Sequence, residues 1–231
     1  MRTDARRAQV VATRRRLASE GPPWTRGRER DFETVTLSAR DCDLLRDLLV
    51  SERAGTVVEV GLAYGSSALA IGEALVTVDR PDARHVIIDP FQESAWSNVG
   101  WDLVHAAGLD AIARLMSEPS SIALGRLVTE GLVADAAFVD GSHRFHEVFV
   151  DLYFLRTIVR PGGLVIMDDH SVPSVRTAVR YFERNLGWTA LPDLVSGGSV
   201  RDVGDGSVPR CMAFRLPDTV DEPPFHEFRP F

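Results

Sequence analysis

Short, β-branched segments alternate with longer segments of helical composition through most of the chain, and this alternation constrains the fold more than any other feature. The pattern predicts strands at residues 56–60, 85–89, 136–140 and 164–168. It predicts helices at residues 37–50, 66–75, 143–159 and 174–186. Ser38 is the expected N-cap of the first helix. Strands and helices that alternate at this spacing favour a doubly wound α/β domain with a mostly parallel sheet.

The composition excludes several classes of protein. Of the 231 residues, 45% are hydrophobic and 26% charged, so the chain can bury a core and is neither disordered, collagen-like nor disulfide-stapled. A net charge of −7 argues against a nucleic-acid-binding surface. Cys42 and Cys211 have no metal-ligand spacing and indicate free thiols, with a single disulfide as the alternative. Without a signal peptide or membrane-spanning segment, the sequence predicts a cytoplasmic protein with no membrane partner.

The charge is unevenly distributed along the chain. Residues 1–30 contain nine arginines against three acidic residues, and a helix is expected from Arg6 to Leu17, ending before Gly21. We therefore predict an arginine-rich arm over residues 1–35, an α/β domain over 36–216 and an extended tail over 217–231. The arm is interpreted as a solvated helix, with a lid or a docking arm for an acidic partner as the alternative. An exposed helix of this kind is also the reason to expect a homodimer.

A glycine-containing segment lies between the first predicted strand and its helix. It runs from Glu59 to Ser67, and Asp89 ends the next predicted strand. Glycine allows close approach to the backbone, and the start of a helix offers N–H groups to an anion. A carboxylate at the end of the second strand can accept hydrogen bonds from ribose hydroxyls. The dinucleotide pattern G-x-G-x-x-G is missing, and a tight strand-to-helix turn would require glycine in any case.

A second polar group follows the two later strands. Asp140 and His143 follow one strand, and Asp168, Asp169 and His170 follow the next. Ligands of open α/β sheets bind beyond the carboxyl ends of the strands, so these side chains converge if the two strands are neighbours in the sheet. Three close carboxylates repel each other unless some are protonated or a cation lies between them. An all-oxygen set is typical of Mg²⁺ or a similar divalent cation. The alternative is that the acids cap a helix or face water.

The glycine segment together with Asp89 resembles the first two motifs of the class I S-adenosylmethionine-dependent methyltransferases. The resemblance implies a Rossmann-like fold, with a mostly parallel seven-stranded sheet and helices on both faces. It also implies S-adenosylmethionine as cofactor, with the methionine end near Glu59 and the glycines, the carboxylate near Ser67 and the ribose near Asp89. The implied cofactor-binding residues are Glu59, Gly61, Ala63, Gly65, Ser67, Asp89, Ser120 and Asp140. Trp96 and Trp101 either flank the adenine or substrate mouth or serve as packing.

The later motifs are similar to those of the metal-dependent O-methyltransferases, both the catechol type and the type that acts on sugar hydroxyls of antibiotics. The residues that carry this likeness are Phe138 to Phe145, Asp151, Arg160 to Gly163, and Asp168 to His170. The resemblance covers residues 37–186. It implies methyl transfer to a hydroxyl of a small molecule such as a natural-product sugar, a polyketide or a phenol. It also implies Mg²⁺ or another divalent cation bound by Asp140, Asp168 and Asp169.

The chain contains no lysine, so the lysine base of catechol-type enzymes has no counterpart here. Its position, three residues after the first metal aspartate, is occupied by His143, which titrates near neutrality and is the predicted general base. His170 is the reserve candidate, and His146 is expected to be structural. Three alternatives remain: a metal-independent methyltransferase, a nicotinamide-dependent oxidoreductase and a non-catalytic cofactor-binding regulator. The candidates for the acceptor pocket are Arg144, Phe145 and Trp188, with ordinary packing as the alternative for each.

Overall fold

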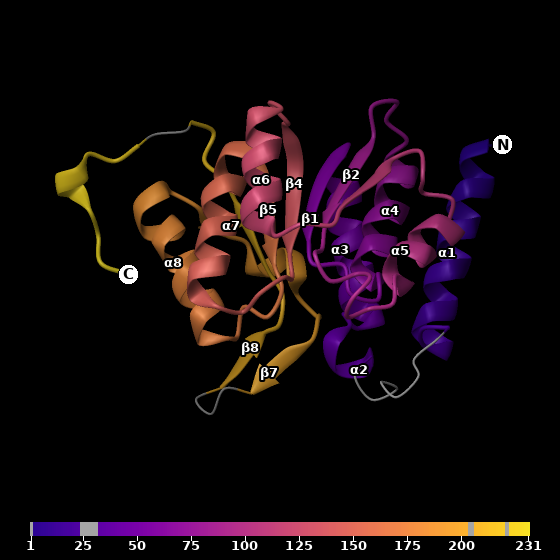
Figure 1. Cartoon of the computed structure of the whole chain (residues 1–231). Helices are drawn as coiled ribbons and strands as arrows, with labels where there is room; N and C mark the ends of the chain where they lie inside the picture. Colours follow the sequence, from indigo (N-terminus) through magenta and orange to yellow (C-terminus); the bar gives the residue numbers. More distant parts are fainter. Residues whose placement is uncertain (1, 24–31, 203–205, 220–221) are drawn as a thin grey trace. The chain divides into compact units, whose positions relative to one another are not determined.

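The chain divides into two compact units, Met1–Pro119 and Ser120–Phe231. Figure 1 shows a computed structural model of the protein, coloured along the sequence. The structure describes residues 2–23, 32–202, 206–219 and 222–231. The division falls between a short strand and the helix that follows it, so each unit combines strands with the helices that pack on them.

The first unit contains three parallel strands in the order β3–β2–β1. These are β1 (Thr56–Val60), β2 (Arg84–Ile88) and β3 (Ala113–Met116). All five residues of β1 are buried, as expected for a parallel strand covered on both faces. The helices of this unit are α1 (Arg2–Glu20), α2 (Phe32–Val35), α3 (Ala39–Ser51), α4 (Ser66–Val78) and α5 (Val99–Ala106).

The arginine-rich helix α1 packs on α4 and takes part in the core of the first unit. Val10 and Leu17 on α1 are buried, and Arg14 Nε lies 2.9 Å from the buried carboxylate of Glu73 on α4. The predicted helix over residues 6–17 is confirmed and is longer at both ends. Ser38 accepts a hydrogen bond from the Asp41 N–H, which confirms the predicted N-cap of α3. The arginines at 26, 28 and 30 lie outside the described residues.

In the part of the sheet formed by the second unit, one strand runs antiparallel to both of its neighbours. β4 (Ala134–Val139) pairs in parallel with β5 (Val159–Met167), β9 (Met212–Arg215) pairs antiparallel to β5, and β6 (Thr189–Ala190) pairs with β9. A separate hairpin is formed by β7 (Val200–Asp202) and β8 (Ser207–Pro209). The helices are α6 (Ser120–Thr129), α7 (Phe145–Ile158), α8 (Pro173–Leu186) and the 3₁₀ turns η1 (Pro192–Val195) and η2 (Phe225–Glu227).

The fold class is confirmed: the protein is α/β, with a mostly parallel seven-stranded sheet flanked by helices. Within the residues of the tail that the structure describes, the Arg229 N–H donates to Asn185 of α8, so this part of the tail lies against that helix. Among the described residues no helix is both long and apolar enough to span a membrane.

Candidate functional site

The loop between β1 and α4 is built from left-handed backbone conformations. Gly61, Ala63 and Gly65 have φ angles of 94°, 44° and 83°. Gly65 is the N-cap of α4, and a Cβ at this position would lie 3.1 Å from the carbonyl oxygen of Gly100. The loop therefore turns sharply into the helix and leaves backbone N–H groups of the first helical turn without intrahelical acceptors. Such a turn suits a ligand that approaches the backbone closely.

Asp89 holds this loop in place. Its Oδ2 accepts hydrogen bonds from the N–H groups of Leu62 and Ala63 at 3.1 and 3.0 Å and from Gln92 Nε2 at 2.9 Å. Its Oδ1 accepts from the Phe91 N–H at 2.8 Å. The buried carboxylate thus clamps the glycine loop to the segment after β2. Binding of a ribose by Asp89 stays a prediction.

Glu59 lies inside the first unit and is fully buried. Its Oε1 accepts a hydrogen bond from the Ser67 hydroxyl at 2.5 Å, and its Oε2 lies 2.8 Å from His85 Nε2. The three side chains join β1, α4 and β2 below the glycine loop. Sequence reasoning missed His85, although a parallel register that pairs Val57 with His85 places it diagonally next to Glu59.

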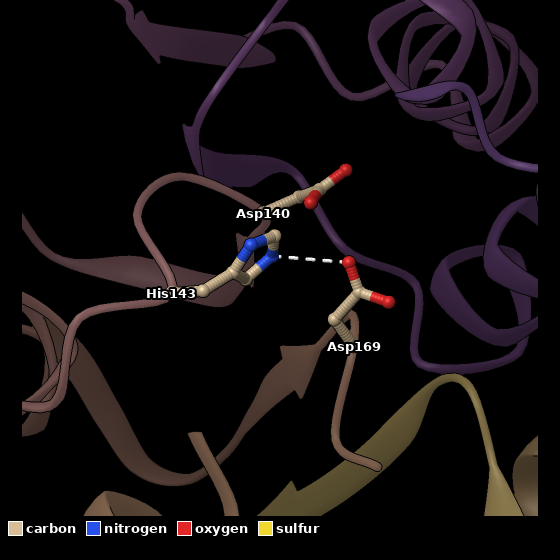
Figure 2. A group of neighbouring side chains, drawn as sticks. All are labelled: Asp140, His143 and Asp169. Carbon is tan, nitrogen blue, oxygen red and sulfur yellow. Dashed lines mark ion pairs between the residues drawn. The ribbon is translucent and has the colours of Figure 1, made fainter. Parts of the chain in front are cut away.

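The carboxylates predicted to converge in the second unit do so. β4 and β5 are neighbours in parallel register, with Val139 opposite Met167, so Asp140 follows one strand end and Asp168 and Asp169 follow the other. Figure 2 shows the His143 ring facing the Asp169 carboxylate, with the Asp140 side chain beside them. One ligand atom from each lies within 4.8 Å of the others, close enough to hold a cation. His143 Nε2 lies 3.0 Å from Asp169 Oδ2.

The charge of these carboxylates is balanced by arginines that the sequence analysis did not single out. Arg210, between β8 and β9, donates from Nε to both oxygens of Asp168 at 3.0 and 3.1 Å and from Nη2 to Oδ2 at 2.7 Å. Arg201 Nη2 lies 2.7 Å from Asp169 Oδ1. The Cys211 thiol donates to Asp168 Oδ1 at 3.1 Å. Asp168 is therefore a fully buried carboxylate enclosed by protein donors.

These contacts shift the ionisation of the site. Burial, with the charges of Asp168 and Asp169, raises the pKa of Asp140 well above its ordinary value. The hydrogen bond with Asp169 raises the pKa of His143, against the opposing effect of burial. Burial opposes ionisation of Asp169, but the hydrogen bond with His143 and the charges of Arg210 and Arg201 bring its pKa below the ordinary value. The result is a histidine–carboxylate pair beside Asp140, whose carboxyl is harder to ionise than an ordinary aspartate.

The residues do not fit the predicted Mg²⁺ site. Both oxygens of Asp168 are engaged by Arg210, so the three-carboxylate set is not available. The group that lies close enough to hold a cation replaces Asp168 by the imidazole of His143. Mg²⁺ prefers oxygen ligands in octahedral geometry and is seldom bound by imidazole.

The remaining candidates have separate surroundings. Ser120 begins α6 and forms a side-chain hydrogen bond with the buried Asp151. Burial lowers the pKa of His170 to about 4, and its ring packs on Phe214. Trp188 is buried against Phe182 with ring centroids 4.8 Å apart, which is a core position.

The other aromatic and basic candidates are less buried. The Trp96 ring contacts Tyr64 edge-on, and Trp101 contacts His105. Phe145 is exposed at the start of α7. The exposed Arg144 guanidinium pairs with Glu147. Arg144 and Phe145 directly follow His143 in the sequence, and both side chains are exposed.

Comparison with known proteins gives one family match. Residues 58–170 match the family model described as a methyltransferase domain. This segment includes the glycine loop, Asp89, Asp140, His143 and Asp169. No curated protein matches the chain.

Solved structures with a similar fold include two O-methyltransferases. One is TomG from Streptomyces achromogenes, involved in tomaymycin synthesis and solved with SAM: 19% identity, TM-score 0.64, covering 95% of this chain and 100% of that chain. The other is from Bacillus cereus, solved with SAH: 15% identity, TM-score 0.63, covering 93% and 91%. Cofactor-bound Rv0187 from MTB is similar at 16% identity and TM-score 0.63, covering 93% and 90%. At these identities the likeness shows the fold.

Proposed function

We propose that this chain, in which residues 58–170 match a methyltransferase domain, transfers a methyl group from S-adenosylmethionine to a hydroxyl of a small molecule. The observation that carries the proposal is that this one matched segment contains both the glycine loop of the first unit and the His143–Asp169 pair of the second. The solved O-methyltransferases of similar fold, one with SAM and one with SAH, add support.

The first unit is assigned the cofactor. The glycine loop fits it because Gly61 and Gly65 leave the backbone open to close approach, and Asp89 fixes the loop from below. S-adenosylmethionine supplies an electrophilic methyl group when bound. The role of the loop is to orient the cofactor, because holding one reactant in a fixed geometry lowers the entropic part of the barrier to methyl transfer.

The second unit is assigned the activation of the acceptor. A hydroxyl becomes a good nucleophile as its proton leaves, and neutral His143 can accept that proton. Asp169 Oδ2, 3.0 Å from Nε2, orients the ring and stabilises the imidazolium that forms. With Nε2 engaged by Asp169, the substrate proton would go to Nδ1. The His143 side chain is 48% exposed, so the ring is accessible to a substrate.

The acceptor is proposed to be a small hydroxylated molecule, as the resemblance implies: a natural-product sugar, a polyketide or a phenol. The nicotinamide-dependent oxidoreductase is the competing function on this type of fold. The glycine loop disfavours it, because the spacing between Gly61 and Gly65 is not that of the dinucleotide fingerprint. A regulator that binds the cofactor without transferring the methyl group would lack a use for the His143–Asp169 pair.

Calorimetric titration with S-adenosylhomocysteine and with NAD tests the cofactor assignment. We expect saturable one-site binding of S-adenosylhomocysteine and none of NAD. In Gly65→Val a β-branched residue is forced to a φ of 83° with its Cβ against Gly100, so affinity should fall at least about tenfold.

Gly131→Val is the matched control. Gly131 has a similar φ of 68°, but a Cβ there meets nothing within 4 Å, so the backbone strain is alike while the glycine loop is untouched. This variant should keep the wild-type affinity. Binding of NAD in place of S-adenosylhomocysteine would contradict the assignment, and so would equal loss of affinity in both variants.

A further inference from the structure

Arg210 occupies the position between the two neighbouring carboxylates that follow β5. Its guanidinium makes a bidentate contact with Asp168: Nε lies 3.0 and 3.1 Å from the two oxygens, and Nη2 lies 2.7 Å from Oδ2. The same Nε is 3.9 Å from Asp169 Oδ1. The Arg210 side chain is 10% exposed and that of Asp168 is fully buried. Bidentate, charge-assisted hydrogen bonds of this kind are among the strong interactions between arginine and a carboxylate.

The oxygens of Asp169 are also engaged by positively charged or proton-donating groups. Oδ1 lies 2.7 Å from Arg201 Nη2, and Oδ2 lies 3.0 Å from His143 Nε2. The mutual repulsion of the carboxylates, which led to the expectation of a metal ion, is therefore relieved by side chains of this chain. Two guanidinium groups thus face two aspartates.

Arg210 is held in this position by its own backbone. Its N–H donates to the Ser199 carbonyl at 2.8 Å, and its carbonyl accepts from the His170 N–H at 2.9 Å. The second bond ties Arg210 to the residue that directly follows Asp169. The connection between β8 and β9 thus places the guanidinium next to Asp168 and Asp169.

We propose that Arg210 takes the place of a divalent cation at the strand ends, so that the proposed methyl transfer proceeds without a metal. The statement about methyl transfer rests on the proposed function. The statement that Arg210 replaces a cation rests on its contacts with the two aspartates and does not depend on that function. Arg210 is a positioning residue. Its guanidinium holds Asp168 by hydrogen bonds, and its positive charge attracts Asp169 and keeps that carboxylate oriented toward His143. Its charge is permanent, because a guanidinium does not lose its proton in proteins.

The same geometry explains why an ion would bind poorly. To coordinate Asp168, a divalent cation would have to displace a guanidinium from three short contacts at a buried site. To bind only at Asp140, His143 and Asp169, it would have to lie close to Arg201 and Arg210, and like charges at such distances repel strongly outside bulk water. Removal of Arg210 should therefore create a cation site.

Titration with Mn²⁺, followed by electron paramagnetic resonance of the free ion, tests this directly and needs no enzyme activity. We expect no saturable binding at submillimolar Mn²⁺ for the wild type. Arg210→Gln should bind Mn²⁺ at least about tenfold more tightly, and Mn²⁺ should raise its melting temperature. Arg160→Gln is the matched control, since it breaks an Arg–Asp pair of 2.9 Å elsewhere in the same unit and should gain no binding.

Two further measurements keep the proposal falsifiable if Arg210→Gln does not fold. Arg210→Lys retains a positive charge and should exclude Mn²⁺ as the wild type does. Methyl transfer by the wild type should be unchanged by a chelator such as EDTA. Saturable Mn²⁺ binding by the wild type, or loss of activity on chelation with recovery on added Mg²⁺, overturns the proposal. Absence of any methyl transfer contradicts the proposed function and leaves the Mn²⁺ result as the test of Arg210.

Discussion

Replacing His143 by alanine is expected to lower kcat for methyl transfer by about 10²–10⁴-fold, the usual contribution of a general base. The KM for S-adenosylmethionine should change little, because the cofactor is assigned to the loop around Gly61 and Gly65 rather than to His143. Initial rates measured over a range of cofactor concentrations separate the two effects. Asp169→Asn, which removes the carboxylate that orients the ring, should lower kcat in the same direction.

His146→Ala provides the control for this prediction. His146 is on α7, three residues after His143, and its side chain is 75% exposed, with Glu147 as its ionic partner. The substitution removes a histidine from the same segment without touching Asp169, so activity should stay at the wild-type level. Full activity in His143→Ala would remove the base assignment and favour transfer by positioning alone.

Replacing Asp151 by asparagine is expected to stabilise the protein increasingly as the pH rises. Asp151 on α7 is buried, and its Oδ1 has no hydrogen-bond partner among the described residues. Burial raises its pKa from 3.8 to about 7, although a hydrogen bond with Ser120 acts in the opposite direction. The folded wild type must therefore bury a poorly compensated negative charge once the carboxyl ionises.

The direction of the pH effect follows from proton binding. Between pH 4 and pH 7 the folded state holds a proton on Asp151 that the unfolded chain has released, so the stability contribution is present at low pH and is lost as the pH rises through about 7. At pH 8 the cost is on the order of 4 kcal/mol for a shift of this size. Denaturant unfolding at pH 5 and pH 8 should show the asparagine variant gaining about 2–3 kcal/mol relative to the wild type between the two, because part of the cost is already present at pH 5.

Glu93→Gln controls for the loss of one negative charge. Glu93 is exposed, and replacement of a surface side chain changes stability by roughly 0.5 kcal/mol or less. If the difference in unfolding free energy between wild type and Asp151→Asn were the same at both pH values, ionisation of Asp151 would not destabilise the folded state. This outcome would contradict the prediction.

The sequence predicts the fold wherever the signal is local. Segments such as 56–60, with consecutive β-branched residues followed by glycine, are strands in the structure within a residue or two. The missed strands give no such signal. β3 is four residues long with an exposed arginine in it, and β6 is two residues long, so both owe their conformation to pairing with neighbouring strands. The predicted arm also differs from expectation in its packing, since α1 contacts α4.

At the site, sequence reasoning placed the groups whose positions depend on strand ends. Asp140 and Asp169 meet because β4 and β5 are parallel neighbours, as the resemblance to the methyltransferases implies. Arg210 could not be placed in this way, because it reaches Asp168 only through the antiparallel pairing of β9 with β5. With Met212 opposite Met167, continuation of the register brings Arg210 to the acidic pair. The signal that could have found it is the need of the acids for a counter-charge.

The most direct test of the account is transfer of an isotopically labelled methyl group from S-adenosylmethionine to a panel of hydroxylated small molecules that includes sugars, polyketides and phenols, with EDTA present throughout. We expect a product that carries the label on oxygen, as identified by NMR, and little of this product with His143→Ala. A protein that binds S-adenosylhomocysteine but labels none of these acceptors, or that labels nitrogen or carbon, would contradict the claim of O-methyl transfer.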